Sequence, residues 1–313
     1  METQAVVLQA PEQLGVSRLA LVPPAAADVV VDINWSGIST GTERLLWSGR
    51  MPTFPGMGYP LVPGYESVGR ITHAGPESGA REGDLVFVPG ARCFGEVRGL
   101  FGGAAARLVV PGSKTTPIPE TLGEEGVLLA LAATARHACV AADGSTPDLV
   151  IGHGVLGRLI ARIAVAVSGK TLMVWETNPA RAAGSSGYTV ADSTTDTRRD
   201  YRCIVDASGA AGLLDVLISR LAPQGEVVLA GFYEAPLSFA FPPAFMREAR
   251  IRVAAEWRPA DIAAVMGLIA SGKLSLSGLI THRNPANDAP DAYRQAFNDA
   301  ACLKMVLNWS GLQ

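Results

Sequence analysis

A glycine-rich turn between an apolar run and an amphipathic segment limits the folds open to this chain. Residues 148–157 read D-L-V-I-G-H-G-V-L-G, in which the run L-V-I is typical of a buried strand. The run ends on glycines with G-x-G-x-x-G spacing, at Gly152, Gly154 and Gly157. This spacing is typical of a turn that binds the phosphates of a dinucleotide, although the three glycines alone are a weak signal.

Each glycine of the turn has a physical reason. Gly152 lets the chain leave the strand, Gly154 lets the backbone approach a pyrophosphate, and Gly157 lets the next helix pack closely on the sheet. That helix begins at Val155 and Leu156, where unpaired N–H groups and the positive end of the helix dipole favour an anion. We therefore expect these five residues to bind the cofactor phosphates.

The segment after the turn supports this interpretation. Apolar residues keep helical spacing up to a glycine stop, at Leu156, Leu159, Ile160, Ile163, Ala164, Val167 and Gly169. Arg158 and Arg162 occupy the opposite, polar face of this expected helix. A second apolar run ends on Glu176, 24 residues after the first glycine, near where a ribose-binding acid is expected. The alternative is a glycine turn that serves only the packing of a helix on a sheet.

Size and charge limit the partners of the chain. Its 313 residues allow about two domains, and a net charge of −3 without a Lys/Arg cluster argues against a nucleic-acid partner. The longest apolar segments contain arginines, so we expect no transmembrane helix, and the N-terminus has no basic region before an apolar core, so we expect no signal peptide. Four cysteines without C-x-x-C spacing fit a reducing cytoplasm. We predict a cytoplasmic protein that acts on a small molecule.

The order of the expected elements indicates an α/β chain. Residues 4–120 carry short alternating segments, which favour an antiparallel, barrel-like domain. A helix is expected over 124–142, and strands then alternate with helices up to about 254, which predicts a parallel sheet with helices on both faces. The strands of that sheet are expected at 148–152, 171–176, near Thr189, 203–207, 226–231 and 250–254. Two helices and a strand should follow, at 260–270, 291–299 and 304–308.

This organisation resembles the medium-chain dehydrogenase/reductase superfamily over nearly the whole chain. The motifs that carry the resemblance are P-L-V-P-G-Y-E-S-V-G-R-I at 60–71, G-D-L-V-F-V at 83–88, F-G-G-A-A-A-R-L-V-V-P at 101–111 and T-A-R-H-A at 134–138. The resemblance implies a Rossmann dinucleotide-binding domain, residues 121–256, and a GroES-like β-barrel catalytic domain, residues 1–120 and 257–313. It also implies a homodimer.

A narrower resemblance lies in residues 36–60, which read S-G-I-S-T-G-T-E-R-L-L-W-S-G-R-M-P-T-F-P-G-M-G-Y-P. This stretch is similar to the dehydrogenases of bacteriochlorophyll biosynthesis. Those enzymes oxidise a 3-(1-hydroxyethyl) side chain of a magnesium tetrapyrrole to an acetyl group. The resemblance therefore implies an alcohol dehydrogenase that serves photosynthesis.

The chain departs from the superfamily where zinc-dependent members hold their metal. Their cysteine from a G-I-C motif, histidine from G-H-E and cysteine before the T-A-x-H helix correspond here to Ser39, Tyr65 and Ala130. A hydroxyl, a phenol and a methyl group do not make the Cys/His site that Zn²⁺ prefers. Only Cys93 lies in the region of their structural zinc lobe. We expect neither zinc site.

Glu176 and Arg181 give opposite indications about the nucleotide. A carboxylate at Glu176 accepts hydrogen bonds from a ribose 2′-OH and repels a 2′-phosphate, which favours NAD. Arg181 could pair with that phosphate, or it could instead face solvent or stack on the adenine. We expect NAD. Further candidates for nucleotide contacts, which could equally be ordinary strand ends or helix positions, are Ala207, Ser208, Gly231 and Thr134.

Without zinc, hydride transfer still requires a group that takes the proton of the substrate hydroxyl. Tyr65 and Glu66 are the candidates, with Ser39, Thr40 and Thr42 as relay hydroxyls. Two objections stand beside this assignment. A tyrosine is protonated near neutral pH unless it is perturbed, and Glu66 could be a buried structural acid.

The segment from Trp47 to Tyr65 combines aromatic and methionine side chains with prolines and glycines, and Arg50 is its only charged residue. Such a surface suits a wide, flat, apolar ring. We assign substrate contacts to Trp47, Phe54 and Tyr59, with Arg50 for a propionate. The alternative is a proline-rich connection that packs on its own domain.

Two other functions stay open at this point. One is a zinc-free quinone or enoyl reductase of the same superfamily, which would normally use NADPH and against which Glu176 argues. The other is a nucleotide-binding regulator that kept the fold without turnover.

Overall fold

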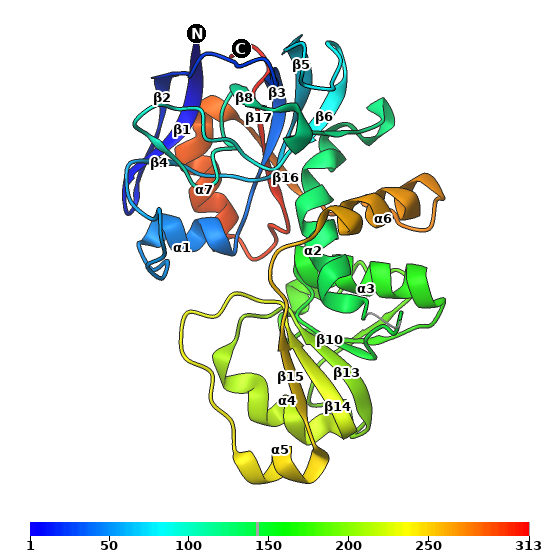
Figure 1. Ribbon diagram of the computed structural model, residues 1–313. Coiled ribbons are helices and arrows are strands. Elements are labelled where there is room, and N and C mark those ends of the chain that lie inside the picture. The colour runs from blue at the N-terminus through cyan, green and yellow to red at the C-terminus, as the bar shows by residue number, and fades with distance from the viewer. Residues whose placement is uncertain (142–143, 313) are drawn as a thin grey trace. The chain divides into compact units, whose positions relative to one another are not determined.

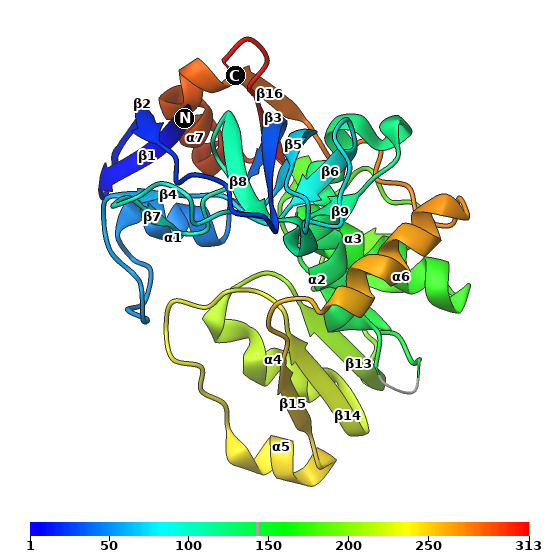
Figure 2. The ribbon, with the colours of Figure 1, turned by 45° about the horizontal axis from the view of Figure 1, so that its top comes forward.

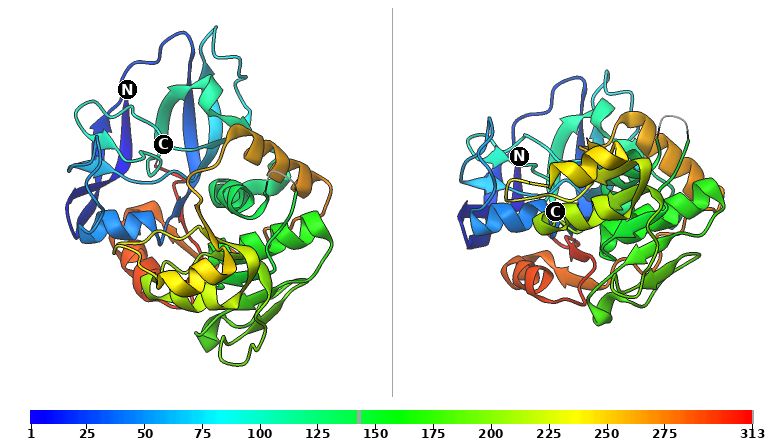
Figure 3. Two further views of the ribbon diagram at one scale, coloured as in Figure 1. Left: turned by 60° about the horizontal axis from the view of Figure 1, so that its bottom comes forward. Right: turned by 90° about the horizontal axis from the view of Figure 1, so that it is seen from below.

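The computed structural model describes residues 1–141 and 144–312. The chain is divided into two compact units. Unit 1 comprises Met1–Ala130 and Leu279–Gln313, and unit 2 comprises Leu131–Gly278. The N- and C-terminal ends of the chain both lie in unit 1 (Figures 1 and 3). The middle of the sequence therefore forms a unit of its own, while the two ends of the sequence build the other.

Unit 1 contains two sheets, which are mainly antiparallel. The larger sheet has seven strands in the order β16-β17-β3-β5-β6-β9, with β8 beside β3. Its strands are β3 (Asp28–Ile38), β5 (Ser67–Ala74), β6 (Leu85–Val88), β8 (Arg107–Pro111), β9 (Thr116–Pro117), β16 (His282–Pro285) and β17 (Met305–Asn308). The smaller sheet, in the order β2-β1-β4-β7, consists of β1 (Glu2–Ala10), β2 (Gln13–Ala20), β4 (Leu61–Val62) and β7 (Arg98–Gly99).

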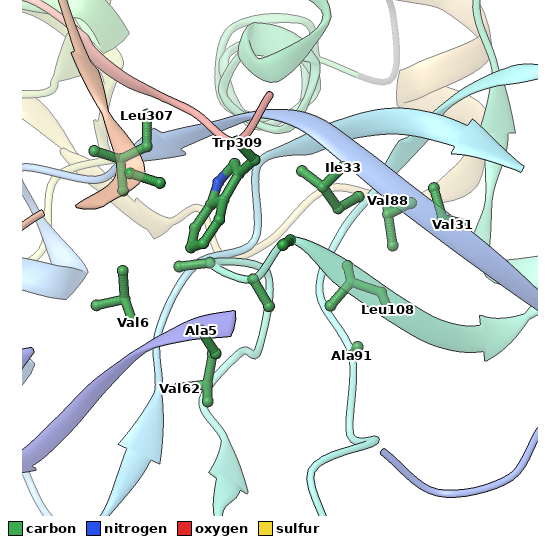
Figure 4. Packing of buried hydrophobic residues seen from close by; sticks show 14 of the residues in the cluster. Ala5, Val6, Val31, Ile33, Val62, Val88, Ala91, Leu108, Leu307 and Trp309 are labelled. Atoms are coloured by element: carbon green, nitrogen blue, oxygen red, sulfur yellow. The ribbon is translucent and has the colours of Figure 1, made fainter. Parts of the chain in front are cut away.

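The core of unit 1 surrounds Trp309, whose side chain is fully buried. Figure 4 shows the indole among Val6, Ile33 and Leu307, which come from β1, β3 and β17. The last strand pairs antiparallel with β3, from Met305 opposite Ile38 to Asn308 opposite Trp35. Residues near the end of the sequence thus complete a core that the first strands begin.

Helix α7 (Ala289–Asn298) covers part of this core. Its buried face carries Ala292, Tyr293, Ala296 and Phe297, which follow helical spacing, and it packs against β2 and β17 (Figure 2). A shorter helix, α1 (Thr42–Ser48), follows β3 and ends at Gly49, whose left-handed φ of 71° stops the helix. Both helices matter for the site because each contributes a buried polar side chain to it.

The helix expected over 124–142 is shorter than the sequence suggested. Glu120–Leu128 form a 3-10 helix, η2, which is broken at Gly123 (φ 47°, ψ −130°), and the α-helix α2 runs only from Leu129 to Cys139. The 3-10 segment is closely packed, because a side chain at Gly126 would lie 2.6 Å from Cδ1 of Ile118. The expected end at residue 142 lies outside the described residues.

Unit 2 is built on a six-stranded parallel sheet in the order β12-β11-β10-β13-β14-β15. All six strands expected between 148 and 254 are present, as β10 (Leu149–Ile151), β11 (Met173–Trp175), β12 (Thr189–Ala191), β13 (Tyr201–Asp206), β14 (Leu221–Leu229) and β15 (Arg250–Val253). Strand β10 is paired with β11 on one side and β13 on the other. The chain therefore changes direction across the sheet at β10, which is where parallel sheets bind ligands.

Helices cover the sheet of unit 2. Helix α3 (Val155–Ser168) lies on one face, and α4 (Leu214–Arg220) and α5 (Phe241–Arg247) lie on the other (Figure 1). Leu149, Ile151 and Ile204 form a core cluster with Leu217 and Ile218 of α4. Gly169 ends α3 with a left-handed φ of 67°, as the sequence predicted. In the described part of the chain, no helix has both the length and the apolar character needed to cross a bilayer.

The division between the units differs from the expected one at both junctions. We expected residues 257–313 to join the first domain, but α6 (Pro259–Ala270) belongs to unit 2. Asp261 of this helix is buried and accepts hydrogen bonds from Arg136 Nη1 at 2.6 Å and from the main chain of Arg258 at 2.8 Å. His137 Nδ1 lies 3.0 Å from the same carboxylate. The ion pair between Asp261 and Arg136, which no sequence pattern predicts, thus fixes α6 to the end of α2.

Candidate functional site

The glycine turn in unit 2 lies at the carboxyl end of β10 and leads directly into α3. Gly152 has φ 91°, a conformation that favours glycine, and a Cβ on Gly157 would lie 1.9 Å from the carbonyl oxygen of Gly152. Gly154 differs from both, because a Cβ there would meet no atom within 4 Å. The first and third glycines are therefore required by the fold of the turn, whereas the second borders open space.

Three further candidates lie next to the turn. The Cα of Ser208 is 3.4 Å from a Cβ position on Gly152, and one on Gly231 would lie 2.7 Å from the main-chain nitrogen of Gly209. Ala207 donates its N–H to the carbonyl of Ile151 at 3.0 Å. The carboxyl ends of β10, β13 and β14 thus bring these residues together. Thr134 lies on α2, where it is half-buried.

Glu176 follows β11 and holds the turn in place. Its Oε2 accepts the main-chain N–H of His153 at 2.9 Å, and its Oε1 accepts that of Asn178 at 2.8 Å. Each carboxylate oxygen keeps a lone pair for another donor, such as a ribose hydroxyl. Arg181 ends the short helix η3 (Pro179–Arg181) five residues later. The open space at Gly154, the N-terminus of α3 and the acid after β11 together fit a nicotinamide dinucleotide.

In unit 1, three hydroxyl groups form a cluster. Tyr65 donates to Ser39 Oγ at 2.8 Å, Ser39 Oγ lies 3.1 Å from Thr42 Oγ1, and Thr42 donates to the Tyr65 oxygen at 3.2 Å. The ring of Tyr65 also packs edge-on against Phe101. Thr40, the other expected relay residue, is half-buried and makes no hydrogen bond to this cluster in the described structure. We refer to Ser39, Thr42 and Tyr65 as the hydroxyl cluster.

Burial raises the pKa of the Tyr65 phenol well above its usual value, and the nearby Glu66 carboxylate raises it further. The hydrogen bonds to Ser39 and Thr42 act in the opposite direction but are weaker. Tyr65 is therefore a neutral phenol near neutral pH, which donates and accepts hydrogen bonds but has no negative charge with which to take up a proton.

Glu66 pairs with a lysine and not with the hydroxyl cluster. Its carboxylate is fully buried and accepts a hydrogen bond from Lys304 Nζ at 2.6 Å, while the same ammonium donates to the carbonyl of Ile38 at 3.1 Å. Within the described structure, Oε1 of Glu66 has no hydrogen-bond partner. Burial raises the pKa of Glu66, and Lys304 opposes that shift. This geometry agrees with the alternative that Glu66 is a buried structural acid. The Glu66–Lys304 pair links the start of β17 to the end of β3 and the start of β5.

A second buried acid, Glu43, lies on α1 beside the hydroxyl cluster and is 2% exposed. Its Oε1 accepts the main-chain N–H of Ser39 at 3.0 Å, and its Oε2 accepts the Tyr293 hydroxyl at 2.6 Å. Burial raises the pKa of Glu43 to about 7, despite these hydrogen bonds. Glu43 thus fixes the backbone of Ser39 through this hydrogen bond.

Sequence reasoning missed Glu43, Tyr293 and Lys304. Of the three, only Lys304 is marked in the sequence, as a charged residue at the start of an apolar strand. In the structure it is 1% exposed. Tyr293 and Glu43 are 250 residues apart in the sequence. Such a pair is found only once the register of β17 and the position of α7 are known.

The expected substrate residues pack mainly on their own unit. Trp47, Phe54 and Tyr59, with Met51 and Met57, surround a small core cluster of Leu8, Leu46, Leu61 and Leu100. Tyr59 also donates to the carbonyl of Leu46 at 2.5 Å. Arg50 is exposed, and its Nε donates to Ser48 Oγ at 3.1 Å. All five ring and sulfur side chains are only half-buried, so each keeps part of its surface open.

Ser39, Tyr65 and Ala130, which align with the metal ligands of zinc-dependent members, offer a hydroxyl, a phenol and a methyl group. Within the described residues, no group of three or more His, Cys, Asp or Glu side chains is placed to hold an ion. The oxygens of Ser39 and Tyr65 are hydrogen-bonded to each other, and Ala130 is a buried methyl group. These donors do not fit zinc, which prefers thiolate and imidazole ligands.

Comparisons with known proteins agree with this architecture. The alcohol dehydrogenase GroES-like domain matches residues 25–120. Among solved structures, a short chain alcohol dehydrogenase of Escherichia coli CFT073 in complex with NADH superposes with a TM-score of 0.82 at 22% identity, covering 98% of this chain and 99% of that one. This similarity shows the fold, a GroES-like domain with a Rossmann sheet.

Two bacterial relatives are much closer in sequence. The 2-desacetyl-2-hydroxyethyl bacteriochlorophyllide A dehydrogenase of Rhodobacter capsulatus is 58% identical over 310 residues, and that of Cereibacter sphaeroides is 55% identical over 314 residues. Each alignment covers 99% of this chain and 99% of the relative. The protein is therefore an oxidoreductase that acts on an alcohol group. It belongs to the 2-desacetyl-2-hydroxyethyl bacteriochlorophyllide A dehydrogenase family, within the medium-chain dehydrogenase/reductase superfamily.

Proposed function

We propose that the protein oxidises the 3-(1-hydroxyethyl) group of a bacteriochlorophyllide to a 3-acetyl group, with NAD as the hydride acceptor and without zinc. The observation that carries this proposal is the hydroxyl cluster of Ser39, Thr42 and Tyr65, two of whose members, Ser39 and Tyr65, align with metal ligands of zinc-dependent relatives. Two relatives that share more than half of their residues with this chain bear the name of that reaction. The reaction converts a secondary alcohol and NAD into a ketone, NADH and a proton.

The nucleotide site supports NAD through Glu176. When bound, the nicotinamide would take the hydride from the carbinol carbon. The chain contributes the open backbone at Gly154 for the pyrophosphate and the Glu176 carboxylate for the ribose hydroxyls. A 2′-phosphate would stand beside that negative charge, so NADP should bind less well.

The hydroxyl cluster supports a role in moving the substrate proton. Because Tyr65 is a neutral phenol that donates to Ser39, we assign these two residues to orienting the substrate hydroxyl, and we assign the hydrogen bond between Ser39 and Thr42 to passing its proton on to water. Glu43 holds the main chain of Ser39 and thereby sets the direction of that hydroxyl. Thr40 has no part in this arrangement.

The chemistry of the substrate explains why such a cluster is sufficient. Positive charge that develops at the carbinol carbon is delocalised into the macrocycle, which lessens the need for a Lewis acid. Trp47, Phe54 and Tyr59 offer half-exposed rings on which a flat macrocycle can stack, and Arg50 offers a cation for a propionate. We further propose that the enzyme works in the cytoplasm as a homodimer.

Incubation with NAD and the hydroxyethyl bacteriochlorophyllide tests the proposal directly. The absorption spectrum should shift to that of the acetyl product, one NADH should form per ketone, and a chelator should leave the rate unchanged. Reduction of a quinone or an enoyl compound by NADPH, without oxidation of the carbinol, would instead support a reductase of the same superfamily. Binding of NAD without turnover of either substrate would indicate a regulator.

A further inference from the structure

A buried histidine lies inside the glycine turn. His153, between the first two glycines, is 0% exposed. Its Nδ1 lies 2.6 Å from the carbonyl oxygen of Arg181, and its Nε2 lies 2.8 Å from the hydroxyl of Tyr188. Because a carbonyl only accepts hydrogen bonds, Nδ1 carries the proton and Nε2 accepts from the tyrosine. Burial lowers the pKa of His153, which favours this neutral form.

A buried arginine of α3 contacts the segment between β11 and β12, residues 176–188. We expected Arg158 on the polar face of this helix, but it is 6% exposed. Its Nε donates to the carbonyl of His153 at 3.0 Å, and its Nη2 donates to those of Arg181 at 3.1 Å and Ala183 at 2.7 Å. A side chain on Gly184 would lie 2.2 Å from Nη1 of Arg158, so the segment lies directly against the guanidinium. Carbonyl partners replace the water that this buried charge gives up.

His153 and Arg158 hold residues 176–188, the segment that carries both charged residues relevant to nucleotide choice. Glu176 begins this segment, Arg181 lies in its middle, and Tyr188 ends it. Glu176 is tied to the turn through the N–H of His153, whereas Arg181 is tied through its carbonyl, which accepts from both His153 and Arg158. The backbone of Arg181 therefore has a fixed position relative to the Glu176 carboxylate.

We propose that His153 and Arg158 are positioning residues for nucleotide selection. By holding the main chain of Arg181, they keep its guanidinium from a 2′-phosphate and leave the Glu176 carboxylate to meet the ribose. Without them, residues 178–184 can shift and Arg181 can pair with the phosphate. This inference rests on the proposed use of NAD, and it explains how a site with an acid and a base five residues apart selects one nucleotide.

Variants of His153 separate the contacts. In His153→Leu both side-chain contacts are lost, whereas the amide of His153→Asn can still donate to the carbonyl of Arg181. Tyr188→Phe removes the contact to Nε2 but keeps the one between Nδ1 and the carbonyl of Arg181, so it serves as the matched control. Dissociation constants for NADH and NADPH, measured by fluorescence titration of the full-length protein, give the preference of each variant. Thermal melts identify any variant that does not fold.

We expect His153→Leu to reduce the preference for NADH over NADPH at least tenfold, mainly through tighter binding of NADPH, while His153→Asn and Tyr188→Phe stay within about threefold of the wild type. Combining His153→Leu with Arg181→Ala should restore the preference for NADH, because the guanidinium that would bind the phosphate is gone. If His153→Leu fails to fold, Arg158→Lys, which keeps the charge but loses the fork, should show the same change in preference.

Two outcomes would overturn the inference. An equal loss of affinity for NADH and NADPH in His153→Leu would give His153 a purely structural role. An unchanged preference for NADH, both in His153→Leu and in its combination with Arg181→Ala, would mean that Arg181 does not affect nucleotide choice. Failure of the proposed function looks different, since the wild type would then bind neither nucleotide or would already prefer NADPH.

Discussion

Burial changes what the polar residues of unit 1 can do. Tyr65, Glu66 and Glu43 are close together, and the pKa of each is raised because the protein interior disfavours a negative charge. Only Glu66 has a cation beside it, at 2.6 Å. We therefore expect neutral hydroxyls, and not a charged carboxylate, to receive the proton of the substrate first.

Tyr65→Phe tests the hydroxyl cluster. The ring and its edge-on contact with Phe101 stay, while the hydrogen bonds to Ser39 and Thr42 are lost. We expect kcat to fall by roughly 100-fold, the lower end of what general acid–base groups contribute. Steady-state kinetics with the hydroxyethyl substrate measures the effect, and the dissociation constant of NADH is the control. A kcat within threefold of the wild type would remove Tyr65 from the proton path.

Glu43→Gln tests the buried acid through the pH dependence of stability. The pKa of Glu43 is raised from 4.5 to about 7, so the folded state holds its proton more tightly than the unfolded state does. The resulting stabilisation is complete below pH 4.5 and is lost as the pH rises through about 7. Between pH 5 and 8.5 the free energy of unfolding should therefore fall less in Glu43→Gln than in the wild type, by on the order of 2 kcal/mol.

Urea unfolding across this pH range measures the difference. Glu77→Gln, at an exposed acid, is the matched control and should follow the wild type. Parallel curves for wild type and Glu43→Gln would show that Glu43 is ionised throughout.

At the level of the elements, the glycine turn has two functions that different glycines perform. Gly157 allows α3 to approach the carbonyl of Gly152, whereas Gly154 borders open space. We expect Gly157→Ala to destabilise the protein by about 1–3 kcal/mol, because the methyl group overfills a packed contact. Gly154→Val should leave thermal stability nearly unchanged but weaken NAD binding by roughly 100-fold or more, since its side chain enters the space for the pyrophosphate.

Thermal melts and NAD titration of the two variants check this pair of predictions. The reverse pattern, with stability lost in Gly154→Val and NAD binding intact, would mean that the pyrophosphate lies elsewhere.

The segment between α1 and β4 carries the proposed substrate contacts. Arg50 is exposed beside the end of α1, with its Nε on Ser48. We expect Arg50→Ala to raise the KM for the chlorophyllide roughly five- to tenfold, as for a partly exposed charged contact, and to leave NAD affinity constant. Arg18→Ala, at an exposed arginine that pairs with Glu2, is the control. No change in KM would return the segment to a purely structural role.

The sequence predicted the elements of unit 2 well, because the parallel strands are short apolar runs between clear turn signals. Helix α3 shows the limit of such reasoning. Its apolar positions and its glycine end were predicted, but Arg158, on the face opposite these apolar positions, is buried where a solvent-facing residue was expected. Helical spacing identifies apolar residues that are buried, whereas a charged residue is buried only where several carbonyls happen to converge on it.

At the level of the whole molecule, the proposal that the reaction needs no zinc can be tested on the purified protein. We expect purified protein to contain no stoichiometric zinc, because Ser39, Tyr65 and Ala130 offer no thiolate or imidazole. Elemental analysis of protein purified without chelators measures this directly. One tightly held zinc per chain would require a ligand set different from the residues discussed above.

The organisation into two units was only partly visible in the sequence. The change from alternating to strand–helix patterns marked the start of the nucleotide-binding part, but α6 was assigned to the other part of the chain. Its position depends on the contacts of Asp261 with Arg136 and His137, more than 120 residues away. Long-range polar pairs of this kind leave no periodic signal, and the same is true of Tyr293 with Glu43.

The place of Trp309 and β17 in the core of unit 1 has a consequence for how the chain is made. A ribosome completes residues 131–278 before it adds the residues that pair with β3 and surround Val6 and Ile33. We therefore expect unit 2 to be able to fold during synthesis, whereas the core around Val6 and Ile33 can close only after the C-terminal residues have left the ribosome. For this chain, we therefore expect the part that is synthesised first to complete its core last.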